Sequence, residues 1–315
     1  MSPNSWICLH PSNATQTTLS LDNRGLAYGD GFFTTMGVID GQILWLDYHQ
    51  QRLVSHAAAL QLQLDSQSLL AMLKTHAKQL QQGMLKLIVT RAEQEVRGYG
   101  YTPNTGGSAC EIWFKSSPMA ITTAQSLPLA NNQFISLQPA ASAICLSSQI
   151  ACLPPPLAGL KSLNRLDNVL ASGELQAIKA KTLAGTIKPS IAEGLLRDMS
   201  GQWVEGTMSN VFYQLVEAPV AKSSNRPHSQ NNSSNYLTQG QWYTPSMAQS
   251  GVAGVMRQVI IDTLSTSNNP VIIRSLQDED LLHLSQLFFC NALRGIMPMS
   301  SLRLLSGEVV SFEAI

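Results

Sequence analysis

The sequence predicts an α+β protein of two domains, a small N-terminal α/β sandwich over residues 1–118 and a larger domain over 133–315. A chain of 315 residues is long enough for two domains of ordinary size. Its first part mixes strand-like and helix-like patterns and ends before a pattern-poor stretch at 119–132, which we interpret as a linker. The second part mixes short strands and helices without a clean βαβ order, so we expect a barrel-like sheet flanked by helices.

The expected N-terminal domain contains a β-hairpin over residues 33–46. Asp40-Gly41 is a two-residue turn signal between its two extended runs. Asp47 is then placed to cap a helix, with Gln50 three residues later as its capping-box partner. A second helix is expected over 66–82, and strands over 84–90 and 110–114.

The expected C-terminal domain alternates strands and helices irregularly. Strands are predicted over 134–138, 143–147, 202–205, 210–216 and 286–291, and helices over 164–180, 254–267 and 276–285. Residues 217–241 form a low-complexity stretch rich in Ser and Asn, which cannot bury apolar area. We expect a surface loop there, with a regulatory or binding segment as the alternative.

Composition argues against several kinds of partner. The formal net charge of +0 disfavours nucleic acid or an anionic membrane as the principal partner. Hydrophobic residues make up 44% and charged residues 13%, which suits a large core and further surface buried in an oligomer. The N-terminus lacks a signal-peptide pattern, and no apolar run reaches about 18 residues. Five cysteines without disulfide-like or metal-like spacing indicate reduced thiols, so we expect a cytoplasmic protein without a metal site.

Lys161 is the first candidate for chemistry. It follows the proline-rich stretch 153–156, which restricts the backbone and can present the side chain rigidly. A lysine that forms an imine must be held against an aldehyde and must be able to lose its proton. The alternative interpretation is a surface lysine at the start of a helix.

Glu205 is the second candidate. It lies between Val204 and the apolar run 211–213, a setting that indicates burial, and a buried lone glutamate is costly unless it is paired. A carboxylate beside a pyridine nitrogen keeps that nitrogen protonated, so the ring can accept electrons. Asn210 is placed to orient the carboxylate or the ring. A glutamate at an exposed strand end is the alternative.

A helix start suited to a phosphate is the third feature. Residues 251–257 resemble a glycine turn that enters a helix, whose first N–H groups bind anions. Arg52 is a second candidate for a charge-assisted contact, and Asn291 and Ala292 at a strand end are candidates for further donors. Together, the lysine, the carboxylate and the helix start predict a pyridoxal 5'-phosphate (PLP) site.

These motifs lie within a longer resemblance that runs from about Leu19 to Pro298. The chain resembles the fold-type IV PLP enzymes, which include branched-chain and D-amino acid transaminases and aminodeoxychorismate lyases. Residues 33–35, 161–166 and 290–293 resemble the lyases within this group. The segments that carry the resemblance are 24–35, 49–53, 86–91, 97–99, 160–166, 205–210, 254–258, 290–293 and 297–298.

The resemblance to the lyases implies a homodimeric, PLP-dependent enzyme of folate synthesis that converts 4-amino-4-deoxychorismate into 4-aminobenzoate and pyruvate. Lys161 resembles the Schiff-base lysine and Glu205 the partner of the pyridine nitrogen. The other positions that resemble the cofactor site are Arg52, Asn164, Asn210, Val255, Met256, Asn291 and Ala292. We expect Thr34, Thr35 and Arg97 at the substrate carboxylates, with a solvated loop residue as the alternative for Arg97.

The chain also departs from its relatives. Gly37 stands where many of them carry an arginine, which affects how the substrate carboxylates are bound. Two stretches, 179–198 and 217–241, look inserted, and we expect both to be loops remote from the cofactor.

Two rival functions stay open. The first is an amino-acid transaminase, which keto-acid-dependent amino transfer faster than pyruvate release would favour. The second is a catalytically idle member that binds PLP, or that serves only as a partner of the synthase that makes the substrate.

Overall fold

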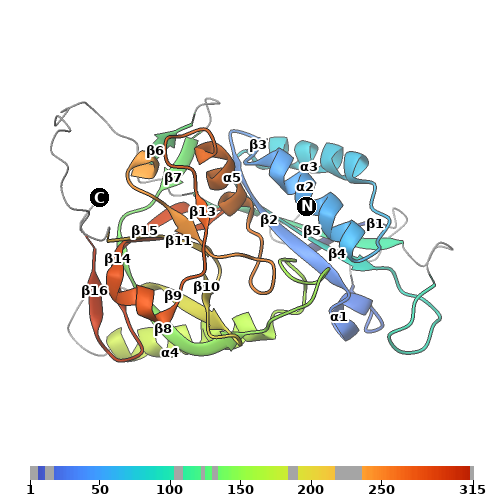
Figure 1. Cartoon of the computed structure of the whole chain (residues 1–315). Coiled ribbons are helices and arrows are strands. Elements are labelled where there is room, and N and C mark those ends of the chain that lie inside the picture. The colour runs from blue at the N-terminus through green and yellow to red at the C-terminus, as the bar shows by residue number, and fades with distance from the viewer. Residues whose placement is uncertain are drawn as a thin grey trace.

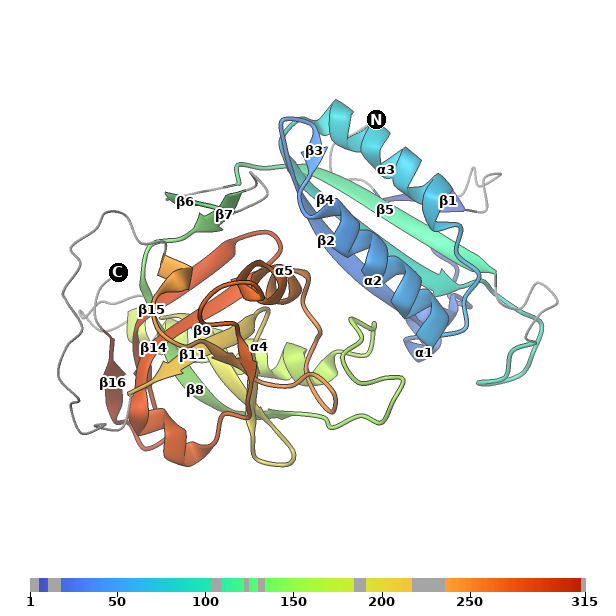
Figure 2. The same cartoon turned by 45° about the horizontal axis from the view of Figure 1, so that its top comes forward.

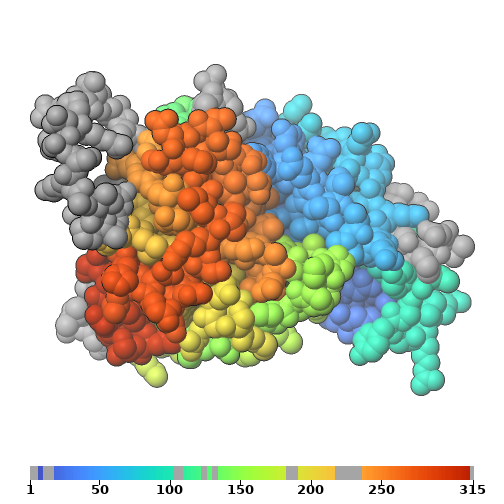
Figure 3. All heavy atoms as spheres, viewed as in Figure 1, coloured from blue at the N-terminus to red at the C-terminus, as the bar shows by residue number. Residues whose placement is uncertain are grey.

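The computed structural model describes residues 6–10, 18–102, 109–121, 125–129, 134–183, 191–216 and 236–312. Two sheets, each with its own hydrophobic core, form two lobes that lie side by side (Figure 1). The space-filling view shows the two lobes in contact along their length (Figure 3). All five cysteines carry free thiols. Within the described ranges, none of the helices is both long and apolar enough to cross a membrane.

An antiparallel five-stranded sheet forms the N-terminal lobe. Its strands are β1 (Trp6–His10), β2 (Gly31–Ile39), β3 (Gln42–Ile43), β4 (Gly83–Arg91) and β5 (Cys110–Pro118), in the order β1-β5-β4-β2-β3. Helices α2 (Leu46–Ala59) and α3 (Ser66–Leu80) lie along one face of this sheet, and the short helix α1 (Arg24–Tyr28) precedes β2 (Figure 2). The expected hairpin is confirmed, since β2 pairs with β3 through Asp40 and Gly41, whose φ angles of 50° and 69° suit a tight two-residue turn.

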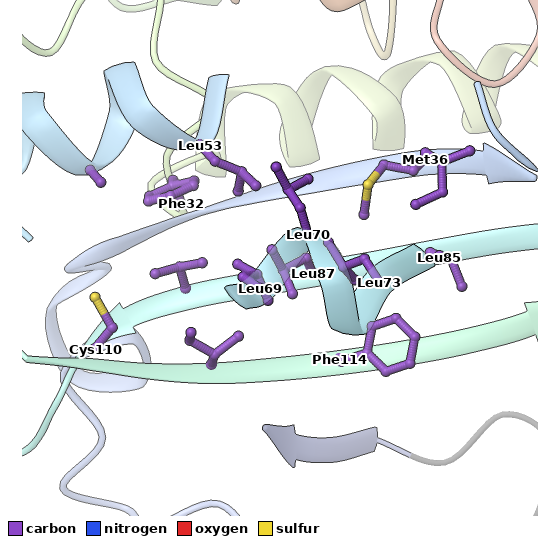
Figure 4. Packing of buried hydrophobic residues seen from close by; sticks show 14 of the residues in the cluster. Phe32, Met36, Leu53, Leu69, Leu70, Leu73, Leu85, Leu87, Cys110 and Phe114 are labelled. Atoms are coloured by element: carbon purple, nitrogen blue, oxygen red, sulfur yellow. The ribbon is translucent and has the colours of Figure 1, made fainter. Parts of the chain in front are cut away.

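The core of this lobe forms between the two helices and alternate residues of the strands. Because side chains alternate across a strand, Phe32 and Thr34 point toward α2 and α3, whereas Phe33 and Thr35 point to the opposite face. On that opposite face, Phe33 and Thr35 line a cavity together with residues of the second lobe. The residues packed under the helices include Phe32, Met36, Leu53, Leu69, Leu70, Leu73, Leu85, Leu87 and Phe114 (Figure 4).

A closed barrel forms the centre of the C-terminal lobe. Its strands are β8 (Ala141–Ile150), β9 (Ile191–Asp198), β10 (Trp203–Gly206), β11 (Asn210–Leu215), β14 (Leu284–Asn291) and β15 (Gly295–Arg303). The ring closes because β8, β9, β10 and β11 pair in succession, β11 pairs with β14, β14 with β15, and β15 with β8. Each strand contributes buried residues to the interior, among them Cys145, Leu195, Trp203, Val211, Phe289 and Met297.

Helices and further strands surround this barrel. Helix α4 (Leu166–Leu183) packs outside β8 and β9, and α5 (Val255–Leu264) packs outside β14. The sheet is extended by β6 (Gln125–Pro128), β7 (Phe134–Leu137), β12 (Tyr243–Thr244), β13 (Ile272–Ile273) and β16 (Val309–Ser311). Two 3-10 helices, η1 (Tyr236–Thr238) and η2 (Asp278–His283), complete the described elements. The predicted class, α+β with a barrel-like second sheet flanked by helices, is confirmed.

Two local predictions are wrong. Helix α2 begins at Leu46 after an N-cap residue, Trp45, in the left-handed region, and no side chain caps it. Asp47 therefore lies in the first turn, where its charge complements the helix dipole. The helix expected over 276–285 is the 3-10 helix η2, and the chain extends into β14 from Leu284.

Two longer segments also differ from expectation. Strand β6 lies inside the expected linker 119–132 and joins the larger sheet by pairing with β7. The stretch 179–198 is no remote loop, because α4 continues to Leu183 and β9 belongs to the barrel, while 184–190 lie outside the described residues. Of the expected loop 217–241, residues 217–235 are likewise outside the described ranges. The domain boundaries themselves stay a prediction.

Candidate active site

A cavity of about 520 Å³ lies between the two lobes. The N-terminal lobe contributes the outward face of β2 and one residue of α2, and the C-terminal lobe contributes the rest of the lining. The cavity brings together eight residues that the sequence predicted for the site: Thr35, Arg52, Lys161, Glu205, Asn210, Val255, Asn291 and Ala292.

The backbone of Lys161 is held by the N-terminal lobe. The carbonyl of Lys161 accepts a hydrogen bond from Phe33 N at 3.0 Å, and its N–H donates to His56 Nε2 at 2.9 Å. Two residues on, Leu163 N donates to the carbonyl of Gly31 at 3.0 Å. Residues 161–163 therefore pair with β2 through a single antiparallel bridge, Phe32 to Ser162, which fixes the direction in which the lysine leaves the backbone.

The side chain of Lys161 is poised to titrate near neutral pH. Its Nζ lies 4.6 Å from the ring centroid of Phe33, and among the described residues it has neither a hydrogen bond nor an ion pair. Burial, together with the positive charge of Arg52, lowers the pKa of Lys161 to about 8. A lysine in this state can form an imine and can carry a proton in either direction.

Glu205 is a buried carboxylate on the C-terminal side of the cavity, with 3% of its surface exposed. Its Oε2 accepts a hydrogen bond from Val252 N at 2.8 Å, and its Oε1 accepts one from Asn168 Nδ2 at 3.4 Å. Burial raises the pKa of Glu205, although the Val252 N–H and the charge of Arg165 oppose that change. Because each carboxylate oxygen has two lone pairs, Oε1 can still accept a hydrogen bond from a ligand.

Two glycines allow the loop before α5 to approach this carboxylate. Asn210, which pairs with Glu205 across β10 and β11, donates from Nδ2 to the carbonyl of Val252 at 2.8 Å. A Cβ at position 254 would lie 1.9 Å from Asn210 Oδ1, so only glycine fits there without movement. Gly251 has φ +76°, a conformation that side chains rarely adopt.

The start of α5 forms a site for an anion. Its N-cap is Gly254, so no side chain occupies the first free N–H groups, which begin at Val255. Arg52 Nη2 donates to the carbonyl of Ala253 at 2.7 Å, which places a guanidinium at the same end of the cavity. Burial lowers the pKa of Arg52 to about 10, so this group stays charged at neutral pH. Lysine, buried carboxylate and helix start together fit the aldehyde, ring nitrogen and phosphate of PLP.

Four predicted residues lie outside the cavity lining. Thr34 points to the other face of β2, where its Oγ1 lies 2.9 Å from His49 Nδ1. Arg97 lies in an exposed loop, and the Asn164 side chain packs against Gly29. The Met256 side chain is buried in the core beneath α5, so only its backbone N–H can face a ligand. The roles predicted for these four residues stay predictions.

Gly37 lies on the cavity-facing side of β2, at the margin of the site. A Cβ there would be 3.0 Å from Leu44 Cδ1 and 3.5 Å from Cδ1 of Leu293, which lines the cavity. Position 37 is therefore adjacent to the cavity, and the absence of a side chain leaves more space at this margin of the cavity.

Sequence reasoning missed Glu193, which organises the turn between β10 and β11. This buried carboxylate accepts hydrogen bonds from Thr207 N at 3.0 Å, from Thr207 Oγ1 at 2.5 Å and from Ser209 Oγ at 2.6 Å. Both partners line the cavity. The only signal in the sequence was a charged residue between apolar positions of a segment that we predicted to be a remote loop.

Asn168, in the first turns of α4, was missed as well. Its Nδ2 donates to Glu205, and its buried Oδ1 has no partner among the described residues. The seven-residue spacing between Lys161 and Asn168 would place both on one face of a helix. Helix α4 starts only at Leu166, however, so this spacing could not identify Asn168. An unpaired buried acceptor next to the carboxylate marks a place where a ligand donor can bind.

Comparisons with known proteins agree with this geometry. The model of the family described as Amino-transferase class IV matches residues 31–302. The chain is 24% identical over 288 residues to the aminodeoxychorismate lyase of Vibrio harveyi, covering 91% of this chain and 88% of that protein. It is 30% identical to the 4-amino-4-deoxychorismate lyase of Pseudomonas aeruginosa, whose crystal structure superposes with a TM-score of 0.69 over 93% of this chain and 90% of that one.

A third relative carries the cofactor. It is a hypothetical aminotransferase from Mycobacterium tuberculosis in its PLP-bound form, with a TM-score of 0.62, 17% identity and coverage of 94% of this chain and 90% of that one. At this identity the likeness shows the fold alone. The family match spans most of the sequence, including both lobes and every residue that lines the cavity. The chain therefore belongs to the class IV aminotransferase family, with the fold of the type IV PLP enzymes.

Proposed function

We propose that this protein is a lyase that converts 4-amino-4-deoxychorismate into 4-aminobenzoate and pyruvate, and that it acts in folate synthesis as a cytoplasmic homodimer. The cofactor is PLP, in keeping with the family and its PLP-bound member. The observation that carries the proposal is one cavity that holds a lysine of lowered pKa, a buried glutamate and the free start of α5. The 30% identity to the Pseudomonas aeruginosa lyase over most of both chains supports a lyase over a transaminase.

The residues of the chain suit the proton transfers of this reaction. When bound, PLP supplies an aldehyde that joins amines and a ring that accepts electrons. In our proposal, Lys161 Nζ takes the proton from the substrate ring carbon that bears the nitrogen. Once the carbon–oxygen bond has broken, Nζ returns a proton to the enol carbon of the three-carbon fragment, which becomes pyruvate. A pKa near 8 allows Nζ to accept and to release a proton at neutral pH.

The other groups of the cavity bind and orient the cofactor and the substrate. In this proposal, Glu205 would pair with the ring nitrogen of PLP, and the free N–H groups of α5 together with Arg52 would hold its phosphate. The substrate carries two carboxylates, and the lining offers Thr35 and the cationic Arg165 to them. Arg97 does not line the cavity of its own chain, so its predicted contact with the substrate would require a second copy in the proposed homodimer.

The direct test supplies purified protein with aminodeoxychorismate made in situ by its synthase. Pyruvate is followed by coupling to lactate dehydrogenase, and 4-aminobenzoate by its fluorescence. The proposal expects equal amounts of the two products without any added keto acid. Protein that shows the absorbance of bound PLP but releases neither product would contradict it.

An amino-acid transaminase is the second candidate, which the family description favours. Its test is amino transfer from branched-chain or D-amino acids to a keto acid. Transfer faster than pyruvate release from aminodeoxychorismate would replace the lyase proposal with this one.

A further inference from the structure

His56 connects helix α2 of the N-terminal lobe to the candidate catalytic lysine. It lies one helical turn after Arg52 and is buried, with 5% of its surface exposed. Its Nε2 accepts the hydrogen bond from Lys161 N at 2.9 Å. Its ring packs edge-on against Phe32, with the centroids 5.4 Å apart. The imidazole thus reaches across the contact between the lobes to the peptide from which the lysine side chain extends.

A chain of hydrogen bonds fixes the tautomer of this histidine. Ser55 Oγ donates to the carbonyl of Arg52 at 3.2 Å, so its lone pair remains to accept from His56 Nδ1, also at 3.2 Å. The proton therefore sits on Nδ1, and the lone pair of Nε2 faces the N–H of Lys161.

The charges around the ring keep it neutral. Arg52 on the same helix, and Arg165 and Lys161 from the opposite lobe, all face it, and no carboxylate contributes among the described residues. Burial, followed by these three cations, lowers the pKa of His56 to about 3. A protonated ring would have no lone pair for the Lys161 N–H, so the bond persists across the working range of pH.

We infer that His56 is a positioning residue that holds the Lys161 backbone and so sets where Nζ reaches into the cavity. The Lys161 peptide has two anchors on the N-terminal lobe: Phe33 N binds its carbonyl and His56 binds its N–H. Without the second anchor, a partly buried N–H would lose its acceptor, and the segment would shift to find another. The inference rests on the proposed role of Lys161 as the lysine that joins PLP.

Three variants of the holoenzyme test this inference. His56→Met keeps apolar volume against Phe32 but removes the acceptor, whereas His56→Gln keeps an acceptor close to the position of Nε2. Ala57→Gly destabilises the same helix without any contact to Lys161, which makes it the matched control. The readouts are hydrogen exchange of the peptide that contains Lys161, the pH midpoint of the bound-cofactor absorbance, and kcat and KM measured separately.

We expect His56→Met to speed exchange at the Lys161 amide about tenfold or more, to shift the pH midpoint and to lower kcat more than it raises KM. His56→Gln should restore most of each property, and Ala57→Gly should change none of them. If His56→Met matches the wild type or the Ala57→Gly control in exchange and midpoint, the inference is wrong. If His56→Met does not fold, His56→Asn replaces it, because its shorter side chain cannot reach the Lys161 N–H.

Exchange and absorbance do not require the lyase substrate. A wild-type protein without pyruvate release would therefore remove the proposed function while leaving the test of His56 intact. Unchanged exchange together with an unshifted midpoint in His56→Met, in a protein that does release pyruvate, would overturn the inference and leave the proposed function standing.

Discussion

The two lobes contribute to the cavity in different ways. The C-terminal barrel supplies side chains that face the ligand, with Glu205 and Asn210 at strand ends and the free start of α5 beside them. The N-terminal lobe supplies mainly anchors, because β2 and His56 hold the backbone of Lys161. The groups that face the ligand and the anchors that place the lysine therefore belong to different parts of the fold. Substitutions in the two lobes should therefore fail in different ways.

The largest effect should follow from removing the group that both lobes serve. Lys161→Ala should abolish the absorbance of lysine-bound PLP and lower pyruvate release by about a thousandfold or more, since it removes the proton carrier as well. Absorbance spectra and the lactate dehydrogenase assay measure the two losses. The exposed Lys78→Ala is the control. Pyruvate release that survives in Lys161→Ala would remove the role proposed for this lysine.

A barrel-side substitution should separate binding from chemistry. Glu205→Gln should still bind PLP but lose about a hundredfold in kcat, because an amide cannot keep the ring nitrogen protonated. Steady-state kinetics with saturating cofactor tests this, with Glu279→Gln on the exposed surface as the control. An unchanged kcat would exclude Glu205 as the partner of the ring.

The capture of PLP by cofactor-free protein should depend on pH through Lys161. Only the neutral amine joins the aldehyde, and the pKa of Lys161 is lowered to about 8, so the neutral fraction grows as the pH rises toward 8. The capture rate should increase about tenfold per pH unit below 8 and level off above it. Stopped-flow absorbance records this profile. A rate that keeps rising to about pH 10 would mean that the lysine has its ordinary pKa.

The smallest effect should come from the loop before α5. In Gly254→Ala, the new methyl group would meet Asn210 Oδ1, so the helix start must shift and the Kd for PLP should rise about tenfold. Gly173→Ala on α4 is the control, since a Cβ there meets nothing within 4 Å. It should leave the Kd unchanged and raise the free energy of unfolding by about 1 kcal/mol. Equal Kd values for both variants would argue against a phosphate at this helix start.

Local patterns predicted the parts of the site that depend on neighbours in the chain. The turn at Asp40-Gly41, the glycine-led start of α5 and the apolar setting of Glu205 each follow from a short stretch of sequence. Thr34 and Thr35 were both expected at the substrate carboxylates, but as neighbours on β2 their side chains face opposite ways. Which of them faces the cavity depends on the helices that cover the other face.

The missed residues depend on contacts between distant segments. Glu193 bonds to Thr207 only because β9 and β10 are neighbours in the barrel, and the strand itself was predicted to be a loop. His56 meets Lys161 across 105 positions of sequence. Neither contact leaves a periodic pattern, so a reading of single segments could not find them. The same reasoning explains why Arg97 could be recognised as a motif but not placed.

The position of PLP on the chain tests the proposed site most directly. The holoenzyme is reduced with borohydride, which fixes PLP to the lysine that holds it, and is then digested and analysed by mass spectrometry. We expect a phosphopyridoxyl group on Lys161 and on no other lysine. A label on Lys86, whose Nζ lies 5.4 Å from the centroid of the same Phe33 ring, or no label at all, would contradict it.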